Sequence, residues 1–154
     1  MKEPLTNSLI LVTKKYLNAF SSEMAHLPLD RYQYILVLID EHGECLSQKA
    51  LSEILQIDKS YMVIILDYLT EKGCVVREQN PKDRREQLIK LTDSARDILP
   101  QIRKIISELN KKALSNITST EIELFNEVLK KIGNNLAENL PNNIMVDFKY
   151  RLKA

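Results

Sequence analysis

The chain has 154 residues, of which 44% are hydrophobic and 28% are charged, and its formal net charge is +1. This balance indicates a folded domain rather than a disordered chain, and no apolar run reaches the roughly 18 residues that a membrane-spanning helix needs. No signal peptide is indicated and two cysteines are too few for a disulfide framework, so we expect a cytoplasmic protein.

Helices are expected along the first part of the chain, because apolar residues recur at helical spacing and only three glycines occur. The first helix is predicted over about residues 5–27 and ends before Pro28, since the residue before a proline avoids the helical region. A second helix is predicted over about residues 30–42, with Tyr34 facing inward and Gly43 as its C-terminal cap.

Two short helices joined by a tight turn are expected next, over about residues 47–73. Ser47 is a suitable N-cap for the first of them. In the second helix, one stripe of apolar residues follows the i, i+3, i+4, i+7 spacing of a buried face. The residues of this stripe are Met62, Ile65, Leu66 and Leu69. Val63 and Ile64 lie outside the stripe, so they are surplus to the packing of this helix.

The pattern then changes to β-branched residues, an Asn-Pro turn and the alternating run LIKL, which predict a two-stranded hairpin over about residues 74–92. Two long helices are expected over about residues 93–139, and the stretch 118–121 has the spacing of a capping box. The first and last helices are more apolar than a chain of this size can cover, which predicts packing against a second copy.

This order predicts a mainly α fold with a small β-hairpin wing, in which a winged helix-turn-helix is flanked by N- and C-terminal dimerisation helices. We expect one domain over residues 1–140, followed by a C-terminal tail over residues 141–154. The tail alternates apolar and polar residues in the manner of a strand, and a frayed segment is the alternative.

Several segments occur in the order and spacing of one known family. They are NPKDRREQLIKLT in the hairpin, LSQKALSEIL and LTEKGCV in the helix pair, and ITSTEIELFNEVLKKI near the last helix. With these segments the chain resembles the MarR (multiple antibiotic resistance regulator) family of winged helix-turn-helix transcriptional regulators over about residues 5–138. The resemblance implies a homodimer that binds double-stranded DNA at a pseudo-palindromic operator, usually as a repressor, and often a small-molecule effector.

The resemblance also implies roles for the charged hairpin tip. In the family, the second Arg of the wing signature enters the minor groove and the Asp two residues earlier steadies it, and these roles map onto Arg85 and Asp83. A narrow minor groove concentrates negative potential, which attracts arginine. The alternative is a solvated hairpin tip. The residues expected to contact DNA are Ser47, Gln48, Lys49, Lys59, Ser60, Tyr61, Val63, Ile64, Lys82, Asp83, Arg84 and Arg85.

Two of these residues depart from the family. Family members commonly carry Thr and Arg where this chain has Val63 and Ile64, which weakens polar readout of the bases. Apolar side chains can still contact the methyl group of thymine in the major groove. The alternative is that both residues pack against another part of the protein.

An effector pocket is expected between the dimerisation helices and the helix pair. The family usually binds aromatic or phenolic anions there, and aromatic walls with one or two polar groups suit a flat ligand. The residues expected to line this pocket are Tyr16, Phe20, His26, Tyr32 and Tyr34. The alternative is that these rings belong to the core of the dimer.

Other chemistries find little support. No catalytic triad, HExxH pair or nucleotide-binding loop occurs, so no enzyme activity and no cofactor are expected. His42 and Cys45 lie close together in HGEC, but surface roles are favoured over a metal site. Cys74 is expected to be buried, whereas Cys45 is the better candidate for a reactive thiol. A protein-interaction or thiol-redox sensor module on the same fold, with weak DNA binding, is the alternative function.

Overall fold

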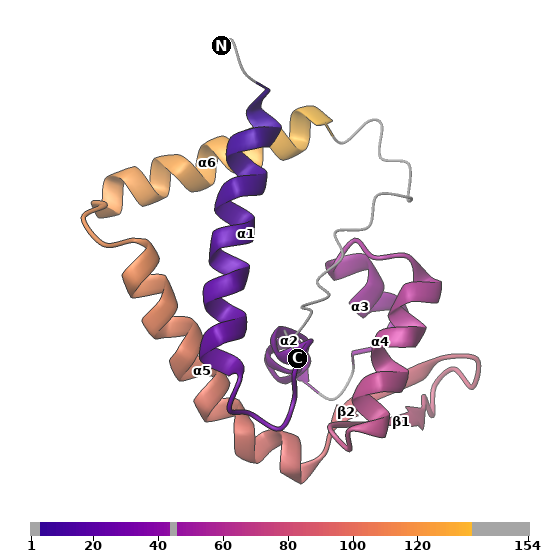
Figure 1. Cartoon of the computed structure of the whole chain (residues 1–154). Helices are drawn as coiled ribbons and strands as arrows, with labels where there is room; N and C mark the ends of the chain where they lie inside the picture. Colours follow the sequence, from indigo (N-terminus) through magenta and orange to yellow (C-terminus); the bar gives the residue numbers. More distant parts are fainter. Residues whose placement is uncertain (1–3, 44–45, 137–154) are drawn as a thin grey trace.

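The computed structural model of the chain describes residues 4–43 and 46–136. Within these residues it contains six helices and a two-stranded antiparallel hairpin, so the expected mainly helical fold with a β-hairpin is confirmed (Figure 1). The elements are α1 (Leu5–Met24), α2 (Gln33–His42), α3 (Gln48–Ile54), α4 (Lys59–Glu71), β1 (Val75–Gln79), β2 (Gln87–Leu91), α5 (Asp93–Ala113) and α6 (Ser119–Leu136). None of the described helices is long and apolar enough to span a membrane.

The elements form two regions (Figure 1). Helices α3 and α4 and the hairpin lie together on one side, and α2 packs against β2 of that side and against α5. Helices α1 and α5 pack against each other on the other side, and in the view of Figure 1 α6 passes behind the first turns of α1. The long helix α5 starts directly after β2, so it joins the two regions.

The core is centred on the helix pair and α2. The apolar stripe expected in the second helix of the pair is confirmed, since Met62, Ile65, Leu66 and Leu69 are all fully buried. They share one cluster with Leu36 of α2, Ile89 of β2 and Ile102 of α5. Each fully buried aliphatic side chain contributes about 1.5–3 kcal/mol relative to an exposed one, so this cluster holds the helix pair in place.

Side chains cap the helices where the sequence indicates. The Ser47 hydroxyl accepts a hydrogen bond from the Ala50 amide at 3.1 Å and so begins α3. The capping box of α6 is also present: the Glu121 carboxylate accepts from the Thr118 amide at 2.8 Å, and the Thr118 hydroxyl accepts from the Glu121 amide at 3.3 Å. These bonds satisfy amides that the first turn of a helix leaves without partners.

The connection between α1 and α2 is longer than expected. Helix α1 ends at Met24, and α2 begins only at Gln33 because Tyr32 adopts a left-handed backbone conformation with a φ of 64°. This conformation sets the phase of α2, and Tyr34 is exposed rather than facing inward as expected. The sequence pattern missed this boundary because the residues concerned are held by α4, as described below.

The hairpin is tied to the helix pair by its second strand. Val75 pairs with Leu91 and Gln79 pairs with Gln87 in an antiparallel register. The Ile89 amide donates a 2.9 Å hydrogen bond to the Leu46 carbonyl, which extends the sheet by one bridge at the start of α3. The wing and the helix pair are therefore joined through backbone hydrogen bonds as well as through the core.

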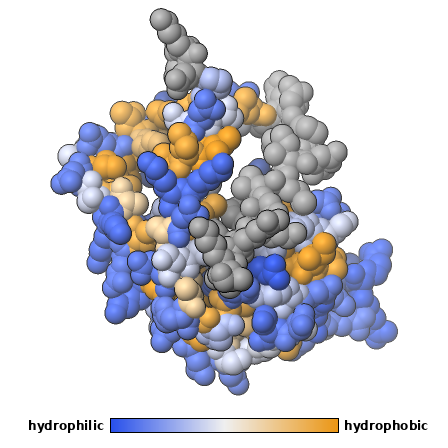
Figure 2. Space-filling model, in the orientation of Figure 1, coloured by the Kyte–Doolittle hydropathy of each residue, from blue (hydrophilic) through white to orange (hydrophobic). Residues whose placement is uncertain are grey.

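Among the described residues, the other region leaves many apolar side chains of α1 and α6 exposed. No residue of α6 is buried, although this helix carries an apolar stripe. Figure 2 shows hydrophobic residues gathered over the first turns of α1 and along α6. The large apolar side chains exposed on these helices are Leu5, Leu9, Ile10, Leu11, Val12, Leu124, Phe125, Val128, Leu129 and Leu136. Contiguous apolar surface of this kind is characteristic of an interaction site.

Candidate nucleic-acid interface

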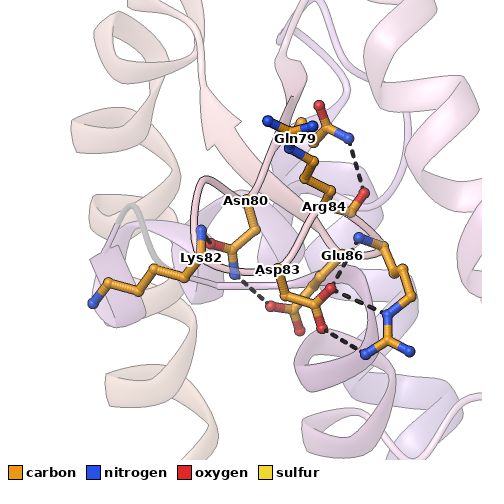
Figure 3. Close-up of polar contacts among 7 residues, drawn as sticks. Gln79, Asn80, Lys82, Asp83, Arg84 and Glu86 are labelled. Atoms are coloured by element: carbon orange, nitrogen blue, oxygen red, sulfur yellow. Dashed lines mark hydrogen bonds and ion pairs between the residues drawn. The ribbon is translucent and has the colours of Figure 1, made fainter.

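At the tip of the hairpin, hydrogen bonds to a neighbouring carboxylate hold the side chain of one arginine in place (Figure 3). One oxygen of the Asp83 carboxylate accepts hydrogen bonds from the Arg85 amide at 3.0 Å and from Arg85 Nε at 3.3 Å. These bonds, the backbone one first, lower the pKa of Asp83, so the carboxylate stays ionised. The Arg85 side chain is 93% exposed. The expected contact between the two residues is therefore present, and it presents the guanidinium to solvent.

A second set of hydrogen bonds closes the loop behind this pair. Asn80 Nδ2 donates to the Glu86 carboxylate at 2.6 Å, and the Asn80 side-chain oxygen accepts from the Lys82 amide at 2.9 Å. Gln79 Nε2 donates to the Arg84 carbonyl at 2.9 Å. Figure 3 shows the Lys82 side chain extending away from this network. The side chains of Lys82, Arg84 and Arg85 thus extend from a turn whose backbone is held by hydrogen bonds.

Helix α4 lies on the same side of the molecule as the wing (Figure 1). Its N-terminus is capped by Asp58, whose carboxylate accepts a 2.7 Å hydrogen bond from the Ser60 amide. Lys59 and Ser60 are exposed, as expected for residues that contact phosphates or base edges. Val63 and Ile64 are exposed as well, so within the described residues they do not pack into the protein.

Tyr61, which was expected to contact DNA, lies in the core instead. Its side chain is only 9% exposed, and its hydroxyl lies 3.3 Å from that of Tyr32. The reason is helical geometry: Tyr61 precedes Ile65 by four residues and shares its buried face. This spacing was present in the sequence and could have identified Tyr61 as a core residue.

Ser47 is a second correction. It is buried, its hydroxyl is engaged as the cap of α3, and its backbone forms a bridge to Leu88 of β2. Gln48 is half-buried, whereas Lys49 is exposed and faces Glu53 one turn later. Of the three residues expected to contact DNA at the start of α3, Lys49 is the most accessible.

A cavity of about 500 Å³ lies between α1, α2 and α5 and the helix pair. Four of the five residues expected in an effector pocket line it: Tyr16, Phe20, Tyr32 and Tyr34. His26 does not, because α1 ends at Met24 and the histidine lies exposed in the following connection. The remaining lining residues are Leu17, Gln33, Ile35, Leu55, Ile57, Ile65, Ile106 and Asn110. The cavity is therefore apolar with a few polar groups, as small-molecule sites usually are.

Two tyrosines of the cavity lining carry hydroxyl groups with hydrogen-bond partners. The Tyr16 hydroxyl donates a 2.7 Å hydrogen bond to Asn110 Oδ1, and burial raises the pKa of Tyr16. The Tyr32 hydroxyl contacts Tyr61 on α4. The helix pair itself contributes Leu55, Ile57 and Ile65 to the wall. A molecule in this cavity would therefore touch the elements that hold α4.

A polar cluster that the sequence did not reveal fastens the α1–α2 connection to α4. The Tyr68 hydroxyl donates a hydrogen bond to Asp30, and the Arg31 guanidinium lies 4.2 Å from the centre of the Tyr68 ring. Burial, with the bond to Asp30, raises the pKa of Tyr68 to about 12. Tyr32 packs edge-on against the same ring at 5.6 Å between centroids. These contacts fix the connection that delays the start of α2.

The cysteines and histidines form no metal site among the described residues, which hold no group of three potential ligands. Cys74 is buried as expected, and burial raises the pKa of its thiol. A raised pKa disfavours the thiolate, which is the reactive form. Cys45 and the tail over residues 141–154 lie outside the described residues.

Comparison with known proteins adds sequence and structural relatives. The sequence model of the MarR family matches residues 30–86, which run from the α1–α2 connection to the wing tip. Among solved structures, a mutant of MarR from E. coli complexed with operator DNA is 26% identical, with a TM-score of 0.76 over 84% of this chain and 93% of that chain.

Two further structures share the fold. A MarR family transcriptional regulator from Listeria monocytogenes, complexed with 26-mer DNA, is 24% identical, with a TM-score of 0.77 over 90% of this chain and 91% of that one. The transcriptional regulator SlyA is 20% identical, with a TM-score of 0.79 over 88% of this chain and 96% of that one. The expected likeness to the MarR family is thereby confirmed.

Proposed function

We propose that the chain is a DNA-binding transcriptional regulator like those of the MarR family, which its sequence and fold resemble, and that it represses transcription as a homodimer on a pseudo-palindromic operator. We further propose that a small aromatic or phenolic compound releases it from DNA. The functional unit is residues 1–140. The observation that carries the proposal is the cavity of about 500 Å³ whose wall includes residues of the helix pair.

The exposed apolar faces of α1 and α6 support the dimer. Phe125 is 54% exposed, and its apolar neighbours on α6 are exposed as well. A second copy that covers these faces would remove them from water, at about 25 cal/mol for each Å² buried. It would also place two copies of α4 and the wing in one molecule. A two-fold dimer matches a palindromic site, with the recognition helices about 34 Å apart.

The contacts of Tyr32 support control by a ligand. Tyr32 lines the cavity, and it touches Tyr61 and Tyr68 on α4. A ligand that favours one orientation of the Tyr32 side chain therefore acts through these contacts on α4, the helix that we propose reads DNA. A compound that binds the free dimer more tightly than the DNA-bound dimer must lower the affinity of the dimer for DNA. The factor is the ratio of these two ligand affinities, because the two binding equilibria are linked.

Fluorescence anisotropy with DNA from upstream of the protein's own gene tests the proposal. Salicylate and other phenols are titrated against the free protein and against its DNA complex. We expect tighter binding to the free protein and a matching loss of DNA affinity. Equal affinity for both forms would show that this cavity does not control DNA binding.

A pair of variants assigns the ligand to the cavity. Tyr16→Phe removes the hydroxyl that bonds to Asn110 within the cavity, and we expect it to change phenol affinity. His26→Ala is the matched control, because His26 lies outside the cavity. If both variants change phenol affinity equally, the compound binds elsewhere.

A further inference from the structure

The middle of α4 presents apolar side chains to solvent on the face next to the wing. Val63 is 38% exposed and Ile64 is 59% exposed, although the buried stripe of the helix is complete without them. Figure 2 shows a hydrophobic patch among polar residues on the side where α4 lies. Burying these two side chains against a partner is favourable, because apolar surface leaves water.

An ion pair borders this patch. Arg77 Nη1 of β1 lies 2.6 Å from the Asp67 carboxylate, and Arg77 Nη2 donates a 3.4 Å hydrogen bond to the Val63 carbonyl. The Arg77 side chain is largely covered, so its charge is committed to α4. The bond neutralises the one carboxylate that α4 carries between its cap and its last turn. From residue 61 to residue 66 the helix carries no charged side chain.

The surroundings of the patch favour DNA as its partner over another protein. Exposed Lys59 lies one turn before Val63, and the wing tip adds Lys82, Arg84 and Arg85 on the same side of the molecule (Figure 1). Such cations neutralise backbone phosphates and orient a helix in the major groove. In that groove the 5-methyl group of thymine is the apolar feature that distinguishes bases.

We propose that Val63 and Ile64 read thymine by contact with its 5-methyl group, and that Arg77 is a positioning residue that holds Asp67 away from the DNA backbone. The proposal rests on the DNA binding described above and adds the identity of the bases that α4 selects. It predicts an operator half-site with thymines beneath the middle of α4.

Uracil substitution tests the methyl contact, because uracil differs from thymine only by that methyl group. Preferred sites are first selected from randomised duplexes with the full-length protein. Each thymine of the consensus is then replaced by uracil in turn. We expect a roughly three- to tenfold loss of affinity at the one or two thymines beneath Val63 and Ile64, near the lower end of a mismatch penalty, and little change elsewhere.

A matched pair of variants assigns this loss to the helix. Val63→Thr keeps the shape of the side chain and replaces one methyl group by a hydroxyl, so we expect weaker discrimination between thymine and uracil. Val76→Thr makes the same change on β1, where the exposed side chain pairs across the strands with Lys90, and it should keep the discrimination. Thermal melts confirm that both variants fold.

The outcomes separate this proposal from the more general one. If selection recovers no preferred duplex, sequence-specific DNA binding fails and methyl readout fails with it. If duplexes are selected but every uracil substitution is neutral, methyl readout alone is overturned. Unchanged discrimination in Val63→Thr also overturns it.

The role of Arg77 is tested by rescue. Arg77→Met leaves the Asp67 carboxylate unpaired near the DNA backbone, so affinity for all sequences should fall several-fold. Adding Asp67→Asn removes the carboxylate and should restore most of that affinity. A merely structural role of Arg77 predicts no rescue, and that result would overturn the assignment.

Discussion

Helices α4 and α6 both carry an apolar stripe at helical spacing, yet the structure treats them in opposite ways. In α4 the stripe is fully buried, and Leu66 and Ile65 belong to one buried cluster with residues of α2, α5 and the hairpin. In α6 no side chain is buried, and Leu124 and Phe125 are among the most exposed apolar residues described. The same sequence pattern is therefore buried in one helix, whereas in the other it stays exposed among the described residues.

The difference indicates that the apolar side chains of the two regions are buried by different surfaces, one among the described residues and one beyond them. The helix pair and wing have a core of their own, together with α2 and part of α5. The faces of α1 and α6 are completed only by a further surface, which we propose to be a second copy. Changes in the buried stripe of α4 should therefore affect folding, whereas changes in the exposed stripe of α6 should affect assembly and, through it, DNA affinity.

The largest effect is expected from a charge placed on the exposed stripe of α6. Phe125→Glu should separate the dimer, because a carboxylate would be buried in the interface without a partner. Operator affinity should then fall by a factor of about 10² to 10⁴, since the two half-sites are no longer bound together. Sedimentation and fluorescence anisotropy measure the two effects. Asn126→Glu, the matched control, adds the same charge beside Phe125 and should leave the dimer intact.

Next in size is a cavity in the core of α4. Leu66→Ala should lower the free energy of unfolding by about 2–5 kcal/mol, because Leu66 is fully buried and its neighbours collapse only in part. Ile64→Ala on the same helix is the control and should cost far less, since Ile64 is exposed. Urea denaturation measures both values. Equal losses would contradict the view that α4 is packed on one face only.

A smaller effect is expected at the wing tip. Arg85→Ala should weaken operator binding by more than about 1 kcal/mol without changing the dimer, because it removes the exposed guanidinium that Asp83 orients. The dependence of affinity on salt should also lessen. Binding isotherms at two salt concentrations provide the measurement. Isotherms identical to those of the parent protein would remove Arg85 from the interface.

The smallest effect is expected where α6 begins. Thr118→Ala removes the hydroxyl that caps the helix and should destabilise it by about 1 kcal/mol. Thr120→Ala, two residues later, takes no part in the capping box and serves as the control. Thermal melts at fixed protein concentration compare the two variants. A larger effect of the control would mean that the cap does not limit the stability of α6.

The sequence was a reliable guide where a pattern is local. The core of α4, the cap at Ser47 and the capping box at Thr118 were predicted correctly, because each depends on residues a few positions apart. The Asp83–Arg85 contact was implied by the resemblance to the MarR family, and it is present. Among the site residues, Tyr61 and His26 were placed wrongly. Tyr61 was assigned to the outer face, although its spacing to Ile65 already indicated a buried position. His26 was assigned to the pocket, and its position depends on where α1 ends.

What the sequence determined by itself is the order and type of the elements, since periodicity, caps and turns act over one or two helical turns. Only the tertiary structure decided what those elements face. The Arg31–Tyr68 contact and the Asp67–Arg77 ion pair join residues of different elements, and nothing in the local pattern marks them. The local pattern also does not mark the left-handed conformation of Tyr32, whose side chain packs against α4. The cavity arises in the same way, because its walls come from α1, α2, α5 and the helix pair at once.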